Sequence, residues 1–375
     1  MPFLSRSLLD LGATERLFKH LKAAMPRVTP HYAVKCFPEP AVMATLAACG
    51  AGFDCASSGE LEQVLSLGVS ADRVIFANPC KRFCDLAAIK KHKVPHTTFD
   101  SLGELRKLAA RAPGTGAVLR LRADDPSARM PFGVKYGALP GEVPELLAEA
   151  LALGVRIAGT SFHVGSGAGD PAAYKRALAA CRACWDLLTE LDPKAREKPW
   201  VVDVGGGFSG GFQADKDGAA YVAVGGGDAD AVASAVNAAL DELFPDAAFP
   251  GGLALISEPG RYFAESSAHV VTRVFGKRER AVHPGPANES KEEEGGDAGS
   301  VVSSLSSSAS LSDDESSDDG EMHEEEAVML EEEVHYYISD GIYGGFNGIV
   351  YDGWLPKAIP FRCDGGTAGV EEGEE

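Results

Sequence analysis

Short apolar runs alternate with amphipathic stretches along the first 265 residues of the chain. Each run is followed by a segment whose apolar residues recur at three- and four-residue spacing, which predicts a helix after each strand. Eight such units in about 250 residues are typical of a closed barrel of parallel strands, so we expect an α/β protein in which residues 8–265 form a (β/α)8 TIM-type barrel. The predicted strands are AVKC (33–36), GFDCA (52–56), VIFAN (74–78), TTFD (97–100), AVLRLR (117–122), GTSFHV (159–164), VVDVGGG (201–207) and LALISEP (253–259).

Two of the predicted helices begin with serine and glutamate in a spacing suited to capping. We expect Ser58, followed by Glu60, to cap one helix, and Ser101, with Glu104 three residues later, to form a capping box at another. We expect the helices to cover the outside of the barrel and predict no catalytic role for them.

After residue 265 the pattern changes from alternating strands and helices to strand-like runs alone. We expect a partial C-terminal β-domain made of 266–283 and 334–362, interrupted by an acidic disordered insert at 284–333 and followed by an acidic tail at 363–375. The insert is interpreted as a flexible loop. An alternative is a regulated segment, because Ser312 precedes three acidic residues in a setting suited to phosphorylation.

Most of the negative charge of the chain lies in this insert. The formal net charge is −20, and residues 284–333 hold 17 acidic residues and one basic residue, which leaves only about −4 for the remainder. A nucleic-acid-binding protein would need a basic face, which is not apparent. No apolar run approaches the roughly 18 residues of a membrane helix, and the N-terminus lacks a signal-peptide pattern. We therefore expect a cytoplasmic protein that binds neither nucleic acid nor membranes.

The eight cysteines are scattered through apolar runs and do not form a disulfide framework. Cys181 and Cys184 make a C-x-x-C within a helical stretch, but a zinc site would need two more ligands at matching spacing. We expect both to be packing residues and predict no metal site.

Reactive residue types follow the predicted strands, at the end where barrel enzymes build their sites. Gly205–Gly207 follow the seventh strand, and Glu258-Pro-Gly-Arg261 follows the eighth, which is the usual phosphate-binding position in such barrels. Glycines let backbone N–H groups approach an anion, and Arg261 adds a forked, permanently charged donor. The glycines match neither the P-loop nor the dinucleotide pattern.

Lys35, at the end of the first predicted strand, is the candidate for covalent chemistry. Its apolar neighbours in HYAVKC are expected to desolvate the amine and lower its pKa, which favours an imine with an aldehyde. Taken alone, a lysine at the end of a strand is usually a solvated rim residue. A lysine and a phosphate site at one barrel mouth together indicate pyridoxal 5'-phosphate, and Glu258 is suited to keeping the cofactor's ring nitrogen protonated.

His163 and Ser166 lie in SFHVGSG after the sixth predicted strand. The histidine is either a packing residue or the ring that stacks on the cofactor, with Ser166 donating to phosphate. Asp203 is expected to orient the glycine turn. Three more charged residues are either partners of this site or structural ion pairs: Asp54, Glu60 and Arg120.

Eight strings spanning about residues 8–354 resemble the eukaryotic ornithine decarboxylases, which are group IV pyridoxal-phosphate decarboxylases of the alanine-racemase type. The strings are PRVTPHYAVKCFPEPAV, GAGFDCASSGELEQVLSLGV, RVIFANPCK, TTFDSLGEL, GTSFHVGSG, DVGGGFSG, ISEPGRYF and YYISDGIYGGFNGIVYDG. The resemblance implies decarboxylation of L-ornithine to putrescine, with Lys35 as the Schiff-base lysine, His163 on the cofactor ring and Glu258 on the ring nitrogen. It also implies substrate contacts by Tyr351 and Asp352. The remaining implied cofactor-binding residues are Asp54, Arg120, Ser166, Gly206, Gly207, Gly260 and Arg261.

The chain departs from the family pattern after Asp352. The family continues to a Cys-Asp motif that acts across a homodimer interface, and Cys363-Asp364 lacks the surrounding pattern. We therefore expect a chain shortened at both ends. Two alternatives stay open: a non-catalytic paralogue that binds antizyme through 82–107, and a decarboxylase of lysine or arginine. Trp354, beside Asp352, is placed to reshape the distal pocket.

Overall fold

The computed structural model of the chain describes residues 6–125, 128, 135–168, 170–210, 212–214, 221–223, 228–265, 267–282 and 331–339. Compact packing divides these residues into a larger unit, which begins at Leu8 and runs to His269, and a smaller unit that contains the described residues from Val270 onward. Each unit is described by itself. Tyr351, Asp352, Ser312, Trp354 and Cys363-Asp364 lie outside the described residues.

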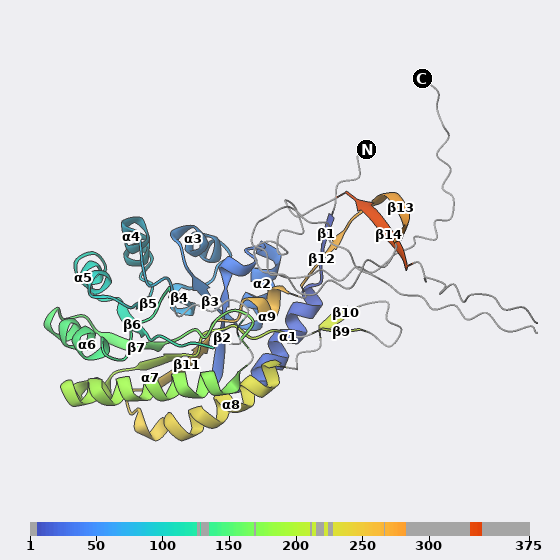
Figure 1. The fold of residues 1–375 in the computed structure, drawn as a ribbon. Coiled ribbons are helices and arrows are strands. Elements are labelled where there is room, and N and C mark those ends of the chain that lie inside the picture. Colours follow the sequence, from blue (N-terminus) through green and yellow to red (C-terminus); the bar gives the residue numbers. More distant parts are fainter. Residues whose placement is uncertain are drawn as a thin grey trace, which may run out of the picture. The chain divides into compact units, whose positions relative to one another are not determined.

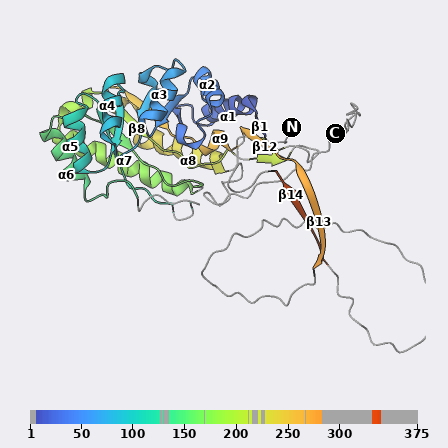
Figure 2. The same ribbon diagram turned by 90° about the horizontal axis from the view of Figure 1, so that it is seen from above.

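The larger unit is a closed barrel of eight parallel strands, which confirms the expected fold class (Figure 1). Helices follow the strands and surround them, as the view in Figure 2 also shows. Around the barrel the strands run in the order β11-β2-β3-β4-β5-β6-β7-β8. Their bounds are β2 (Val28–Ala33), β3 (Gly52–Cys55), β4 (Val74–Phe76), β5 (His96–Phe99), β6 (Gly116–Arg120), β7 (Ile157–Ser161), β8 (Trp200–Asp203) and β11 (Leu253–Ser257).

The helices of this unit are α1 (Leu11–Ala24), α2 (Pro40–Cys49), α3 (Ser58–Ser66), α4 (Phe83–His92), α5 (Leu102–Arg111), α6 (Val143–Ala152), α7 (Pro171–Leu191), α8 (Asp228–Leu243) and α9 (Arg261–Ala264). Short 3-10 turns are η1 (Val34–Cys36), η2 (Ala71–Arg73), η3 (Pro193–Glu197) and η4 (Asp246–Ala248). The β8–α8 connection carries a small antiparallel pair, β9 (Phe212–Ala214) and β10 (Tyr221–Ala223). No helix among the described residues is long and apolar enough to cross a membrane.

The first barrel strand lies about five residues before its predicted position. β2 is Val28–Ala33, and the predicted residues 34–36 form the turn η1 instead. The sequence VTPHYA conceals this strand because Pro30, Thr29 and His31 interrupt its apolar pattern, whereas the continuous apolar run begins only where the strand ends. Lys35 therefore lies just past the strand, at the barrel mouth.

Side chains inside the barrel are arranged in layers along its axis. Alternate residues of a strand face the interior, and the interior apolar cluster consists of Ile75, Ala77, Val118, Val201 and Ile256. The larger hydrophobic core lies outside the strands, where aromatic side chains such as Phe53, Phe76 and Phe99 pack against the helices. Complete burial of one such ring stabilises the fold by about 1.5–3 kcal/mol. The interior apolar layer separates the polar residues at the two ends of the barrel.

The helix caps differ in detail from those predicted. α3 is capped by Ser57, one residue before the predicted Ser58: its hydroxyl accepts from Glu60 N at 3.3 Å, and the Glu60 carboxylate accepts from Ala56 N at 2.8 Å. Ser101 is the N-cap residue of α5, but its side chain makes no capping hydrogen bond. The reason is that Glu104 is buried and paired with two lysines instead, at 2.8 Å from Lys81 and 2.5 Å from Lys107.

The smaller unit contains an antiparallel pair of strands, β13 (Val274–Val282) and β14 (Glu331–Ile338). β14 begins at Glu331, three residues earlier than the boundary expected for the strand-like segment, because Glu331, Glu332 and Glu333 pair with Val282, Ala281 and Arg280. Two further strands, β1 (Arg6–Leu9) and β12 (Ala268–Val271), pair with each other.

Candidate active site

Six of the predicted site residues lie at the same end of the barrel. Asp54 is in β3, Arg120 and Asp203 are the last residues of β6 and β8, and Glu258 directly follows β11. Lys35 and His163 follow β2 and β7 by two residues each. Because all eight strands are parallel, these positions share the mouth at the carboxyl ends of the strands.

Lys35 forms an ion pair with Asp54 across neighbouring strands. The Lys35 Nζ–Asp54 Oδ2 distance is 2.6 Å, and the carboxylate is fully buried whereas 52% of the lysine side chain is exposed. Burial opposes the charge of the amine, but the negative charges of Asp54 and Glu258 outweigh it, and the pKa of Lys35 is raised. The expectation that apolar neighbours lower this pKa is therefore wrong, because it overlooked a carboxylate supplied by the next strand.

Glu258 and Asp203 form a pair of buried carboxyl groups beneath the mouth. Asp203 Oδ1 accepts from Gly205 N at 2.9 Å, so this residue orients the glycine turn as predicted. Burial raises the pKa of Asp203 to about 7, although hydrogen bonds with Glu258 and Gly205 lower it in part. Burial and the negative charges of Asp203 and Asp54 hold the pKa of Glu258 well above its usual range. Burial and the neighbouring carboxylates therefore favour the protonated form of Glu258.

The glycine turn after β8 is held by contacts between backbones. Gly205 and Gly207 have φ angles of 66° and 106°, which favour glycine over other residues. A Cβ added at Gly206 would overlap the carbonyl oxygen of Glu258, and one at Gly207 would overlap that of Gly165. The loops after β7, β8 and β11 thus approach one another too closely for side chains at these glycines.

Arg261 and Ser166 meet beside this turn. Arg261 donates to Ser166 Oγ from Nη2 at 2.9 Å and from Nε at 3.2 Å. A Cβ added at Gly260 would lie 3.2 Å from Ala33 Cβ, so the Arg261 loop also packs against the end of β2, which leads into Lys35. A guanidinium, a hydroxyl and a glycine backbone therefore converge next to the lysine, as anion binding requires.

His163 presents a neutral ring to the same mouth. Its Nδ1 accepts from Gly165 N at 3.1 Å, which places the ring proton on Nε2. Burial, reinforced by the positive charges of Arg120 and Lys35, holds the pKa of His163 well below its usual value. A flat, uncharged imidazole is suited to stacking on an aromatic cofactor ring.

Two tyrosines near the site gave no signal in the sequence. The Tyr174 hydroxyl, on α7, donates to the carbonyl of Gly206 at 2.9 Å and is fully buried. The Arg120 guanidinium carbon lies 5.1 Å from the centre of the Tyr136 ring, a cation–π distance. Both contacts join segments far apart in the chain, and neither tyrosine stands in a recognisable motif. Glu60, one of the three charged residues expected to be either site partners or structural ion pairs, takes part in the cap of α3.

The residues at this mouth fit pyridoxal 5'-phosphate. That cofactor requires a lysine, an anion site and a group that holds a proton at its ring nitrogen, and the structure brings residues of all three kinds together. The fully buried Asp54 Oδ1 has no hydrogen-bond partner among the described residues, which leaves one acceptor available near Lys35. No group of three or more potential metal ligands occurs in the described part of the chain.

Known proteins are similar to this chain in sequence and in fold. The family described as "Pyridoxal-dependent decarboxylase, pyridoxal binding domain" matches residues 11–265. The chain is 36% identical over 364 residues to the chloroplastic ornithine decarboxylase of Nicotiana glauca, a match that covers 97% of this chain and 68% of that protein. It is 34% identical to antizyme inhibitor 2 of Xenopus laevis, with 93% and 64% covered. The chain thus spans about two thirds of the length of these relatives.

The arginine decarboxylase of Paramecium bursaria Chlorella virus is a similar solved structure. The two structures superpose with a TM-score of 0.72 and 29% sequence identity, over 96% of this chain and 79% of that one.

Proposed function

Because the chain belongs to the pyridoxal-dependent decarboxylase family, we propose that it removes the α-carboxylate of a basic amino acid, with L-ornithine as substrate and putrescine as product. The observation that carries this proposal is the meeting of the Lys35–Asp54 pair, the glycine turn and the buried Glu258 at one barrel mouth. The names of the relatives support the substrate class, since they include decarboxylases of ornithine and of arginine.

Different residues of the mouth would hold different parts of the cofactor. Lys35 would hold its aldehyde carbon, and Arg261, Ser166 and the backbone of Gly206 and Gly207 would bind its phosphate. When bound, pyridoxal phosphate supplies a ring that accepts the electron pair left when carbon dioxide departs.

The chain's own groups control the protons around this reaction. Asp54 holds a proton on Lys35 through the 2.6 Å contact, so the amine must release that proton before it can act as a nucleophile. Glu258 lies close to the position proposed for the ring nitrogen, and burial, reinforced by the negative charge of Asp203, raises its pKa and favours its protonated form. His163 covers one face of the site and excludes water there. Tyr351 and Asp352, outside the described residues, are proposed to contact the substrate, with Asp352 accepting the distal ammonium group.

Cofactor loading and turnover are measured separately to test this proposal. We expect the purified chain to bind pyridoxal phosphate with a visible absorbance band that Lys35→Ala abolishes. Lys175→Ala is a matched control, because Lys175 is an exposed α7 lysine paired with Glu242. Release of labelled carbon dioxide from ornithine, lysine and arginine then identifies the substrate. A wild-type chain that binds no cofactor would contradict the proposal.

A second candidate function is regulation by binding antizyme without catalysis. It is favoured by the similarity to antizyme inhibitor 2 and by the basic end of α4, which includes Lys90 and Lys91. A chain that captures antizyme and loads no cofactor would support this candidate. Loading and turnover without capture would exclude it. We also propose that the chain forms a homodimer, which light scattering of the purified protein tests.

A further inference from the structure

The end of the barrel opposite Lys35 contains a cavity of about 350 Å³. Its lining comes from the amino-terminal ends of the strands and from the loops that precede them, so it is separated from the Lys35 mouth by the interior apolar layer. Five of the lining residues carry titratable or charged groups: Arg27, His31, Asp72, Arg73 and His96.

Two glycines make room for basic side chains inside this end of the barrel. Gly52 pairs with His31 and Gly116 pairs with His96 in the strand register. A Cβ at Gly52 would overlap the His31 ring. A Cβ at Gly116 would lie 2.6 Å from Arg156 Nη2 and 2.9 Å from His96 Cδ2, so the guanidinium and this imidazole lie side by side over the same backbone. Larger residues at either position would displace these basic groups.

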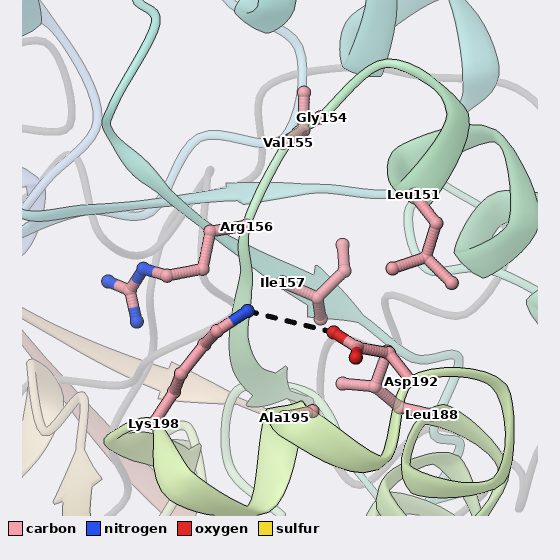
Figure 3. Close-up of a pocket in the computed structure, with 9 residues that line it drawn as sticks. All are labelled: Leu151, Gly154, Val155, Arg156, Ile157, Leu188, Asp192, Ala195 and Lys198. Atoms are coloured by element: carbon pink, nitrogen blue, oxygen red, sulfur yellow. Dashed lines mark ion pairs between the residues drawn. The ribbon is translucent and has the colours of Figure 1, made fainter.

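The positive charge at this end is not neutralised by nearby carboxylates. Arg156 lines a smaller pocket with Asp192 and Lys198, which form an ion pair at 3.6 Å, and Figure 3 shows the Arg156 guanidinium directed away from that pair. Arg156 donates at 3.5 Å to the carbonyl of Pro199, and no carboxylate lies within ion-pair distance of it among the described residues. The Arg156 guanidinium therefore makes one long hydrogen bond to a backbone carbonyl and no ion pair among the described residues.

Arg73 is in a similar position. It donates to the carbonyls of Ala47 and Ala51 but forms no ion pair within the described part of the chain. Arg27, in contrast, is compensated by Asp241 and Asp246. Asp72 is the one acid among the described lining residues. Arg73 lines the cavity together with two imidazoles and one acid, and the Arg156 guanidinium lies beside one of these imidazoles, His96.

We propose that this cavity binds a phosphate-class oxyanion, held by the lining residues Arg73 and His96 and by Arg156, which lines a neighbouring pocket and whose guanidinium lies beside His96. The site is distinct from the proposed cofactor site, which lies on the other side of the apolar layer, and it does not depend on decarboxylase activity. A tetrahedral oxyanion provides several acceptors for the forked guanidinium donors, which are otherwise occupied only by backbone carbonyls.

The protonation of the imidazoles supports this proposal. Burial, with Arg156 and His31 nearby, lowers the pKa of His96 to about 4, and burial also lowers the pKa of His31. An anion between them would reverse these shifts, because it stabilises the charged ring. Affinity should then increase as the pH falls from 8 to 6. The charged groups that face these rings are Arg27, Arg73, Arg156, Asp72 and, across the apolar layer, Asp54.

The proposal is tested by calorimetry with sulfate, whose charge is constant between pH 6 and 8. The protein is first saturated with pyridoxal phosphate so that the proposed cofactor site does not take up the probe. We expect one saturable site, bound about tenfold more weakly by Arg156→Gln, as loss of a charged hydrogen-bonding partner predicts. Arg106→Gln is the matched control, since Arg106 is an exposed arginine paired with Glu149, and it should bind as the wild type does.

A second variant, an NMR titration and a comparison of ligands complete the test. His96→Asn should flatten the pH dependence, and in the wild-type protein the His96 ring signals should shift in an NMR titration with sulfate even if a variant fails to fold. Comparison of inorganic phosphate with glycerol 3-phosphate distinguishes a free ion from an esterified phosphate. Absence of saturable sulfate binding, or equal affinity in Arg156→Gln, would overturn the proposal.

Discussion

Replacing Asp54 by asparagine should change the titration of Lys35 more than any other property of the chain. The substitution removes the negative charge 2.6 Å from the amine but keeps a side chain of nearly the same shape. Asp54 is fully buried and contributes to the raised pKa of Lys35 both by its charge and by its hydrogen bond. Without it, the effect of burial on the amine would prevail, and the pKa should fall.

The size of the change follows from the geometry. Two unit charges 4 Å apart attract by about 4 kcal/mol at an effective dielectric constant of about 20. Because 52% of the Lys35 side chain is exposed, solvent screens the pair, and we reduce this value to about 2 kcal/mol. That free energy corresponds to a decrease of about 1.5 pKa units.

The assay is the pH dependence of acetylation at Lys35, followed by mass spectrometry of the peptide that contains it. Only the neutral amine reacts, so the pH at which the rate is half-maximal reports the pKa. Asp241→Asn is the control, because Asp241 is an exposed acid paired with Arg27. An unchanged Lys35 titration in Asp54→Asn would refute the reasoning.

The same pair also links stability to pH. The folded-state pKa of Lys35 is raised above its unfolded value, so the contribution of the pair is complete below about pH 10.4 and is lost as the pH rises through the folded value. Denaturation at pH 7 therefore measures the whole contribution of the pair.

Three further predictions concern the carboxyl pair, the glycine turn and a buried ion cluster. Because the pKa of Asp203 is raised to about 7, its ionisation opposes folding, and the free energy of unfolding should fall as the pH rises from about 4 to 7. Asp203→Asn should remove this decrease, which is on the order of a few kcal/mol and is measured by urea denaturation across that pH range. Gly207→Ala should destabilise the fold by more than about 1 kcal/mol and weaken binding of the cofactor's phosphate, since φ is 106° and its Cβ would overlap a carbonyl. Gly103→Ala, in α5 with open space around it, is the control and should be neutral or stabilising in the same denaturation series. Glu104→Gln should cost about 3–5 kcal/mol, because it leaves the buried Lys81 ammonium without its carboxylate partner; a thermal midpoint equal to that of the half-buried Glu149→Gln control would contradict this.

The order of strands and helices was predictable from the sequence because each element has its own period. Seven of the eight predicted strands overlap the observed strands along most of their length, and β2 was misplaced because Pro30 and His31 break its apolar pattern. The caps at α3 and α5 show the same limit at the level of single residues. Which serine caps a helix, and whether Glu104 turns back to it, depends on lysines contributed by other segments.

The candidate site was predictable where a motif holds adjacent residues together. Gly205–Gly207 and Gly260-Arg261 belong to such motifs, and the parallel barrel brings them to one mouth. The direction of the Lys35 pKa was not predictable, because its partner Asp54 is 19 residues away and on another strand. Tyr174 likewise reaches the turn only through the packing of α7, which no local pattern specifies.

The glycine turn after β8 is held by main-chain atoms of three loops, and this has a consequence for how such a scaffold can diversify. Its shape depends on the lack of side chains at Gly206 and Gly207 and not on the identity of any particular neighbour. Substitutions elsewhere around the opening can therefore change its surface while the glycine turn, the proposed anchor for the coenzyme's phosphate, stays fixed. A single inherited framework is in this way able to serve enzymes that differ in the length of the molecule they recognise.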